Sequence, residues 1–192
     1  MYLLHYITLH YIIVSSSSSS SMARNKTGPF FINHVLDIAG TTVAQTQNMD
    51  ISAYVDAGDS QGLEIMSVDY IWYDSVTLLP IQNGVTVFQA SVQLKDAATG
   101  GLVAYDNLHL VSSGGIYYDT AKSVSQDADI FPDQLMISKT GGRVTVNDNL
   151  ELVGKSSASV ANMAVCARIQ CKVVNLSKRD YMTLALQTVA DN

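Results

Sequence analysis

The sequence predicts an all-β fold, an antiparallel β-sandwich of about eight strands with a short C-terminal helix. Short runs in which apolar and polar residues alternate recur from Phe30 to Val174, and this period of two is typical of strands that pack one face on a core. Turn sequences that contain glycine separate the runs, as at Asn83-Gly84. The runs follow one another at the short intervals that are typical of sandwiches and barrels.

In chain order, the expected strands cover residues 30–32 with 35–38, 49–55, 63–73, 85–94, 102–111, 135–137, 144–146, 150–153 and 164–174. Two tight hairpins are expected, at Asn83-Gly84 and at Gly141-Gly142, because both pairs tolerate the backbone angles of short turns. The turn at 98–101 makes strands 85–94 and 102–111 an antiparallel pair. A long polar excursion is expected from Ser112 to Asp133.

Two of these strands show their faces most clearly. In strand 63–73 one face is expected to carry Met66, Val68, Tyr70 and Trp72. In the last strand the apolar face comprises Val165, Ala167, Ile169, Cys171 and Val173. Cys166 lies on the opposite face, so the two cysteines cannot pair with each other. Cys171 is predicted to be a core residue and Cys166 a free thiol, which gives no indication of an oxidising compartment.

The tail changes from strand to helix periodicity. Ser177 is a suitable N-cap with Asp180 three residues later, and a helix is expected from about residue 178 to 190. Its apolar face would carry Tyr181, Leu184, Ala185 and Val189. We expect this face to pack on the sandwich or on a neighbouring subunit.

The chain is expected to divide into a leader or disordered arm over residues 1–28 and a single β-sandwich domain over residues 29–192. Residues 1–14 are apolar and aromatic, and seven serines follow at 15–21. Three interpretations stay open: a signal peptide that lacks a basic start, a functional apolar arm, and, as the favoured one, translation from Met22. The apolar run is too short to cross a bilayer, which needs about 20 residues.

We expect that removing residues 1–21 leaves the fold intact, because this segment shows no strand alternation and its serines have too little apolar content to pack. The measurement is the solubility and melting temperature of a chain made from Met22. Insolubility of that chain beside a soluble full-length chain would contradict this expectation.

The charge balance argues against a dedicated nucleic-acid binder. The net charge is −6, and the densest basic spots, Arg24 with Lys26 and Lys178-Arg179, are too short to neutralise a phosphate backbone. Only 15% of the residues are charged, which indicates that copies of the chain cover part of its surface.

No enzymatic activity is expected. Gly58 to Gly62 matches the G-x-S-x-G pattern around Ser60, but the residues after it alternate as a strand, whereas a nucleophile elbow needs a helix there. We therefore expect a plain turn, and no catalytic or cofactor-binding residue is predicted. A small hydrolase that uses Ser60 ranks third among the functional hypotheses.

No metal ligand is predicted either. Acidic residues gather in two places, Asp56, Asp59 and Glu64 in the first and Asp127, Asp129 and Asp133 in the second. Neither group has the spacing of a helical calcium loop, so solvated loop acids are expected, with a loop calcium site as the alternative. His34 and His109 are far apart in sequence, and His109 is expected on the less buried face of its strand.

Aromatic residues offer one further candidate site. Trp72 and Tyr70 are expected in the core, whereas Tyr117 and Tyr118 lie beside Gly115, where a loop contact with a sugar or simple loop packing is expected. Tyr73 could join such a platform. The glycosylation patterns at Asn25 and Asn175 matter only if the chain is secreted.

A sandwich of alternating strands over residues 30–174, with an N-terminal arm and long loops, resembles the single jelly-roll capsid proteins of icosahedral viruses. The resemblance implies a structural protein of the virion whose partners are copies of itself in a homo-oligomeric shell, with other capsid proteins as further candidates. It implies no cofactor. Arg24 and Lys26 are nearly all the basic residues of the arm, so direct contact with nucleic acid is not expected. The alternative is a secreted or cell-surface β-sandwich that binds carbohydrate.

Overall fold

The computed structural model describes residues 24–81, 87–119, 124–131 and 142–190, with the side chains of 124–131 and 188–190 left aside. The elements in chain order are β1 (Arg24–Asn25), β2 (Phe30–Asp37), β3 (Gln45–Asp50), the 3-10 turn η1 (Ser52–Tyr54), β4 (Gln61–Asp74), β5 (Val87–Lys95), β6 (Leu110–Asp119), β7 (Val124–Phe131), β8 (Arg143–Thr145), β9 (Asn149–Ser156), β10 (Met163–Asn175) and α1 (Lys178–Ala190). Within these ranges, no helix is long and apolar enough to span a bilayer.

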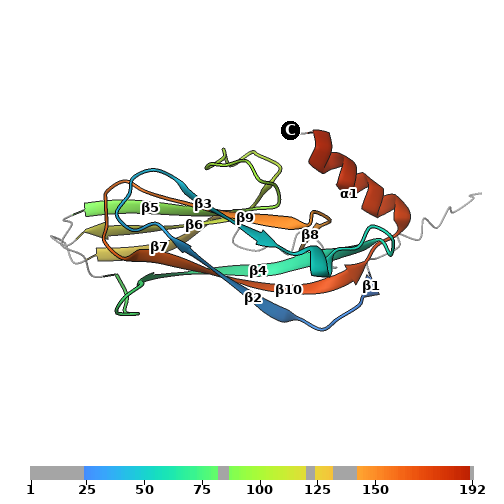
Figure 1. The fold of residues 1–192 in the computed structure, drawn as a ribbon, viewed down its shortest axis with the longest axis horizontal. Helices are drawn as coiled ribbons and strands as arrows, with labels where there is room; N and C mark the ends of the chain where they lie inside the picture. Colours follow the sequence, from blue (N-terminus) through green and yellow to red (C-terminus); the bar gives the residue numbers. More distant parts are fainter. Residues whose placement is uncertain (1–23, 82–86, 120–123, 132–141, 191–192) are drawn as a thin grey trace, which may run out of the picture.

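The strands form two antiparallel sheets that pack face to face (Figure 1). Sheet A has the order β2-β10-β4-β8, and β1 pairs with β10 beside β2. Sheet B has the order β3-β9-β5-β6-β7. The fold class predicted from the sequence, an antiparallel sandwich with a C-terminal helix, is confirmed.

The pairing is nested, as in a long hairpin that has been rolled up. β1 and β2 both pair with the last strand, β10. The pairs β3 with β9, β4 with β8 and β5 with β6 follow inward. Rolling adds the contacts of β10 with β4 and of β9 with β5. This order, with β7 as an extra strand beside β6, is the topology of a jelly roll.

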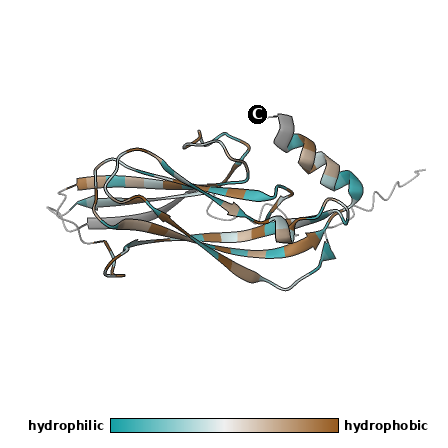
Figure 2. Cartoon of the chain, in the orientation of Figure 1, coloured by the Kyte–Doolittle hydropathy of each residue, from teal (hydrophilic) through white to brown (hydrophobic). Residues whose placement is uncertain are grey.

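The core fills the space between the sheets with inward side chains from both. Sheet A contributes Leu63, Ile65, Val165, Ala167, Ile169 and Cys171, and sheet B contributes Phe88, Val92, Leu94, Leu150 and Leu152. The alternation predicted for β10 is confirmed, since Cys171 is buried and Cys166 is partly exposed. Figure 2 shows hydrophobic and hydrophilic residues following one another along the strands of both sheets.

The prediction that Met66 shares a face with Val68, Tyr70 and Trp72 is wrong because β4 contains a bulge. Gln170 of β10 pairs with Ser67, but the next residue, Cys171, pairs with Ile65, so Met66 is left over. The extra residue reverses the alternation. Leu63 and Ile65 face the core before the bulge, and Val68, Tyr70 and Trp72 face it afterwards.

The predicted excursion from Ser112 to Asp133 is wrong as well, because β6 and β7 occupy most of it. Gly114 and Gly115 suggested a turn, but they lie inside β6 and pair with β5. A Cβ atom on Gly114 would lie 2.5 Å from Cδ2 of Tyr70, so this glycine makes room for a core aromatic ring.

Two other expected strands differ from the structure. Strand 102–111 begins only at Leu110, because residues 96–109 form a loop. Strand 49–55 is replaced by β3 and η1, because the Asp50 carboxylate accepts a hydrogen bond from the Ser52 amide at 2.9 Å and turns the chain. Hydrogen bonds from the Ser52 side chain and from its backbone amide hold the pKa of Asp50 below its usual range. Asn83-Gly84, strand 135–137 and Gly141 lie outside the described residues.

The C-terminal helix begins as predicted. The Ser177 hydroxyl accepts a hydrogen bond from the Asp180 amide at 3.1 Å and donates one to the Asp180 carboxylate at 2.7 Å. Tyr181, Leu184 and Ala185 are half-buried, as expected for the apolar face. Figure 1 shows that α1 rises away from the sandwich at the end where β1 lies.

Candidate functional site

Ser60 lies in a tight turn between η1 and β4. Asp56 and Gln61 exchange two backbone hydrogen bonds across this turn, and the Asp56 carboxylate accepts the Gly58 amide at 2.8 Å. Ser60 itself has a φ of 52°, in the left-handed region. A strand rather than a helix follows it. The turn predicted from the sequence is confirmed, and the strand-turn-helix context of a nucleophile elbow is missing here.

The acidic residues 56–64 separate in space. Glu64 is buried and lies 3.2 Å from the Lys172 amine, whereas Asp59 is exposed and lies 3.9 Å from Lys26. In the part of the chain that the structure describes, no three potential ligands come together to hold a metal ion. Asp133 lies outside the described residues, as do the side chains of Asp127 and Asp129.

His109 is buried, so its predicted place on the less buried face is wrong. Its Nδ1 lies 3.1 Å from the Asp96 carboxylate, whose second oxygen accepts a hydrogen bond from Arg143 at 2.7 Å. Arg143 also donates to the Leu110 carbonyl oxygen at 2.9 Å. This network ties β8 of sheet A to the start of β6 in sheet B, so His109 stabilises the fold. His34 lies in β2, far from this network in the sheet order, and partial burial lowers its pKa.

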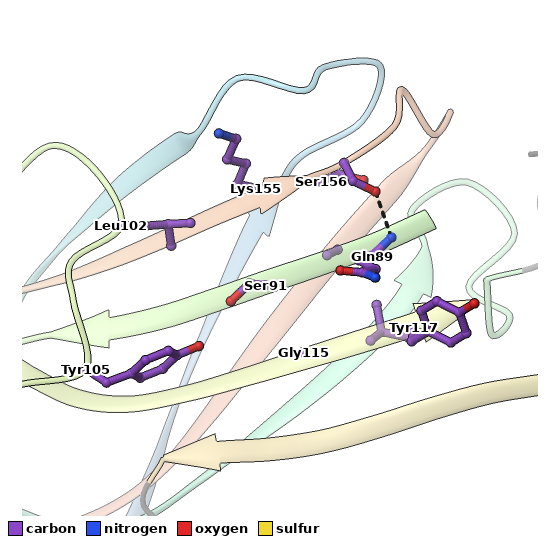
Figure 3. A pocket seen from close by; sticks show the side chains of 11 residues that line it. Gln89, Ser91, Leu102, Tyr105, Gly115, Tyr117, Lys155 and Ser156 are labelled. Atoms are coloured by element: carbon purple, nitrogen blue, oxygen red, sulfur yellow. Dashed lines mark hydrogen bonds between the residues drawn. The ribbon is translucent and has the colours of Figure 1, made fainter. Parts of the chain in front are cut away.

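A groove on the outer face of sheet B is a candidate site among the residues that the structure describes. Its volume is about 530 Å³, within the range of small-ligand pockets. The lining residues come from β5, β6, β9 and the loop 96–109: Gln89, Ala90, Ser91, Leu102, Tyr105, Gly115, Ile116, Tyr117, Lys155, Ser156 and Ser157. We call this site the sheet B groove (Figure 3).

The loop 96–109 lies over Gln93, Lys95 and Glu151 on the outer face of sheet B and borders the groove through Leu102 and Tyr105. Gln93 anchors the loop, because its amide side chain accepts a hydrogen bond from the Val103 amide at 2.8 Å and donates one to the Val103 carbonyl at 2.9 Å. This fixes the backbone next to Leu102, one of the two loop residues that form the wall of the groove.

A buried ion pair beneath the same loop provides a second anchor. The Lys95 amine lies 2.7 Å from the Glu151 carboxylate, and both side chains are almost fully buried. Glu151 accepts hydrogen bonds from the amides of Thr99 and Gly100, and Lys95 donates to the Gly101 carbonyl at 2.5 Å. Every polar group of the pair therefore has a partner in the loop, which holds the wall of the groove in place.

The aromatic pair Tyr117-Tyr118 does not form one platform, because neighbouring residues of a strand face opposite sides. Tyr117 lines the sheet B groove, as expected for a functional contact. Tyr118 packs inward on Phe88, with ring centroids 5.5 Å apart. The residue that joins Tyr117 at the groove is Tyr105, which the sequence analysis did not single out.

Sheet A carries a different surface on its outer face. Val35 and Ile71 pair with Cys166 from opposite sides, so these three residues form a row across β2, β10 and β4. Val35 and Ile71 are 44% and 49% exposed, and Phe31 on the same face of β2 is 48% exposed. The Arg168 guanidinium lies over the Phe31 ring, 4.3 Å from its centroid. We call Phe31, Val35, Ile71 and Cys166 the sheet A patch.

The strand order places this chain in the jelly-roll class of β-sandwiches. Among solved structures it is similar to the VP1 protein of Trichodysplasia spinulosa-associated polyomavirus, with 8% identity, a TM-score of 0.43 and coverage of 81% of this chain and 100% of that chain. The same VP1 in complex with 3′-sialyllactose is similar at 10% identity and a TM-score of 0.43, covering 80% of this chain and 98% of that chain. No protein-family model and no curated protein matches the sequence.

Proposed function

We propose that this protein is a structural subunit of a viral capsid that assembles with copies of itself into a shell. The observation that carries the proposal is that a jelly roll, a fold used by viral capsid proteins, here leaves large apolar side chains exposed, and among the described residues two groups of them suit a subunit contact. They are the sheet A patch and the exposed side of α1. In this proposal the protein lies in the virion, is not an enzyme, and has its own copies as main partners.

The first surface suits contact between subunits because it is apolar and exposed. Its residues come from three neighbouring strands, so their positions are fixed by the sheet. Burying apolar area in such a contact stabilises it by about 25 cal/mol for each Å² removed from water. A closed, symmetric assembly covers such a patch on every copy without open-ended growth.

The second surface lies on α1. Met182 and Leu186 are 58% and 64% exposed, and they are four positions apart in the sequence, so they lie one turn apart on one side of the helix. An exposed apolar pair on a helix that rises from the domain is suited to insertion against a neighbouring subunit. The sequence analysis placed the packing face of this helix at Tyr181, Leu184, Ala185 and Val189, whereas in this proposal Met182 and Leu186, on the exposed side, contact the neighbouring subunit.

Replacing Met182 and Leu186 together by glutamate is expected to block assembly without unfolding the domain, because both side chains are exposed in the single chain. The matched control replaces Thr183 and Gln187 by glutamate, which adds the same charge with the same spacing on exposed polar positions of α1. Particle formation by chains made from Met22 is measured by sedimentation and by electron microscopy of negatively stained grids.

The wild-type and control chains are expected to form closed particles, and the Met182→Glu, Leu186→Glu chain to remain small. The proposal fails if the wild-type chain stays monomeric at high concentration over a range of salt and pH. Equal assembly of all three chains would exclude α1 as a contact while leaving the sheet A patch to be tested by Val35→Asp with Ile71→Asp.

A further inference from the structure

Two small residues, Ser91 and Gly115, form the centre of the floor of the sheet B groove, and an aromatic ring stands on either side of Ser91. Ser91 of β5 pairs with Gly115 of β6 and with Lys155 of β9, so this row crosses three strands. Figure 3 shows Tyr105 and Tyr117 on opposite sides of Ser91. A flat ligand can therefore rest on the floor and contact a ring at each end.

The backbone around the floor is already paired. β5 lies between β9 and β6, and β6 lies between β5 and β7. An extended peptide binds a sheet by adding a strand to a free edge, and the groove has none. Recognition in the groove must therefore come from side chains, and the polar ones that line it include Gln89, Ser91 and Ser157.

These polar groups favour a neutral ligand that both donates and accepts hydrogen bonds. Amide and hydroxyl side chains do both, and Lys155 adds further donors. Lys155 is the charged residue among the lining residues, and the net charge of the chain is −6, so a polyanion is disfavoured. We propose that the sheet B groove binds a neutral disaccharide, whose apolar ring faces pack on Tyr105 and Tyr117 and whose hydroxyl groups bond to Gln89, Ser91 and Lys155.

The groove is preorganised for such a ligand. Tyr105 belongs to the loop that Gln93 and the Lys95–Glu151 pair fix onto sheet B, and Tyr117 belongs to a strand paired on both sides. A rigid site loses little conformational entropy when it binds, which matters for a small ligand with few contacts. The volume of about 530 Å³ is within the range of small-ligand pockets.

The test is saturation-transfer NMR and titration calorimetry on the chain made from Met22, with lactose, cellobiose and N,N′-diacetylchitobiose as probes. At least one disaccharide is expected to bind with a Kd of about 1 mM. Tyr105→Ala and Tyr117→Ala are each expected to weaken it about tenfold. Ser91→Phe fills the floor while both tyrosines remain, so it is expected to abolish binding even if a tyrosine variant fails to fold.

Tyr73→Ala is the matched control, because Tyr73 is a half-buried tyrosine of β4 in the other sheet. Its affinity for the disaccharide is expected to equal that of the wild-type chain. The Met182→Glu, Leu186→Glu chain leaves the groove unchanged, so its binding separates this proposal from the proposed assembly. No binding of any probe to the folded wild-type chain, or binding that survives Ser91→Phe, overturns the proposal.

Discussion

Replacing Cys171 by aspartate is expected to unfold the domain, whereas the same replacement at Cys166 is expected to leave it folded. Cys171 is fully buried among the apolar residues of sheets A and B. Burial raises the pKa of its thiol to about 11, so the position disfavours negative charge. An unpaired carboxylate there costs several kcal/mol, against a total stability of about 5–15 kcal/mol.

Cys166 has the opposite surroundings, although it lies in the same strand. It is partly exposed on the outer face of sheet A, and the nearby Arg168 opposes the rise that burial gives to its pKa. The guanidinium would favour an aspartate at this position. Thermal unfolding followed by circular dichroism measures both variants, and an equal loss of melting temperature would show that the register of β10 is wrong.

Glu151→Leu is expected to destabilise the protein by about 3–5 kcal/mol, because it leaves the buried Lys95 amine without its negative partner. The amides of Thr99 and Gly100 lose their acceptor at the same time. The double variant Lys95→Met, Glu151→Leu removes the uncompensated charge and is expected to be more stable than the single one.

Urea denaturation of the single and double variants measures these free energies of unfolding. The control is Asp59→Leu, which removes the acidic partner of Lys26 from an exposed pair and is expected to cost less than about 1 kcal/mol. If Glu151→Leu cost no more than Asp59→Leu, the Lys95–Glu151 pair would not hold the loop. If the double variant were less stable than Glu151→Leu, the uncompensated charge of Lys95 would not be the cause of the stability lost in the single variant.

The parts of the fold that local patterns determine were predicted well. β10 follows its predicted alternation from Val165 to Cys171, and α1 begins at the Ser177 cap as its sequence indicates. Errors arose where a distant contact decides the local structure. Met66 is displaced by a bulge that is visible only in the pairing with β10, and Gly114 serves the Tyr70 ring rather than a turn. Neither partner can be identified from residues nearby in the sequence.

The candidate site was predicted in part. Tyr117 was singled out for its place beside glycine, but Tyr105 was not, because the loop that carries it was expected to be a strand. The anchors of that loop were also missed. The sequence held only a weak indication of these anchors. Gln93 and Lys95 occupy the polar positions of β5, and polar side chains on the outer face of a strand are more simply expected to contact water than a covering loop.

The nested strand order also constrains the time course of folding. β10 lies between β2 and β4, so the two earlier strands are not joined in sheet A until the last strand of the domain is present. During synthesis on a ribosome, sheet A therefore cannot be completed before residues 163–175 have left the exit tunnel. Until then the apolar faces of β2 and β4 are exposed to water. The pairing of β2 with β10 joins residues far apart in the sequence, and such long-range pairing makes folding slow.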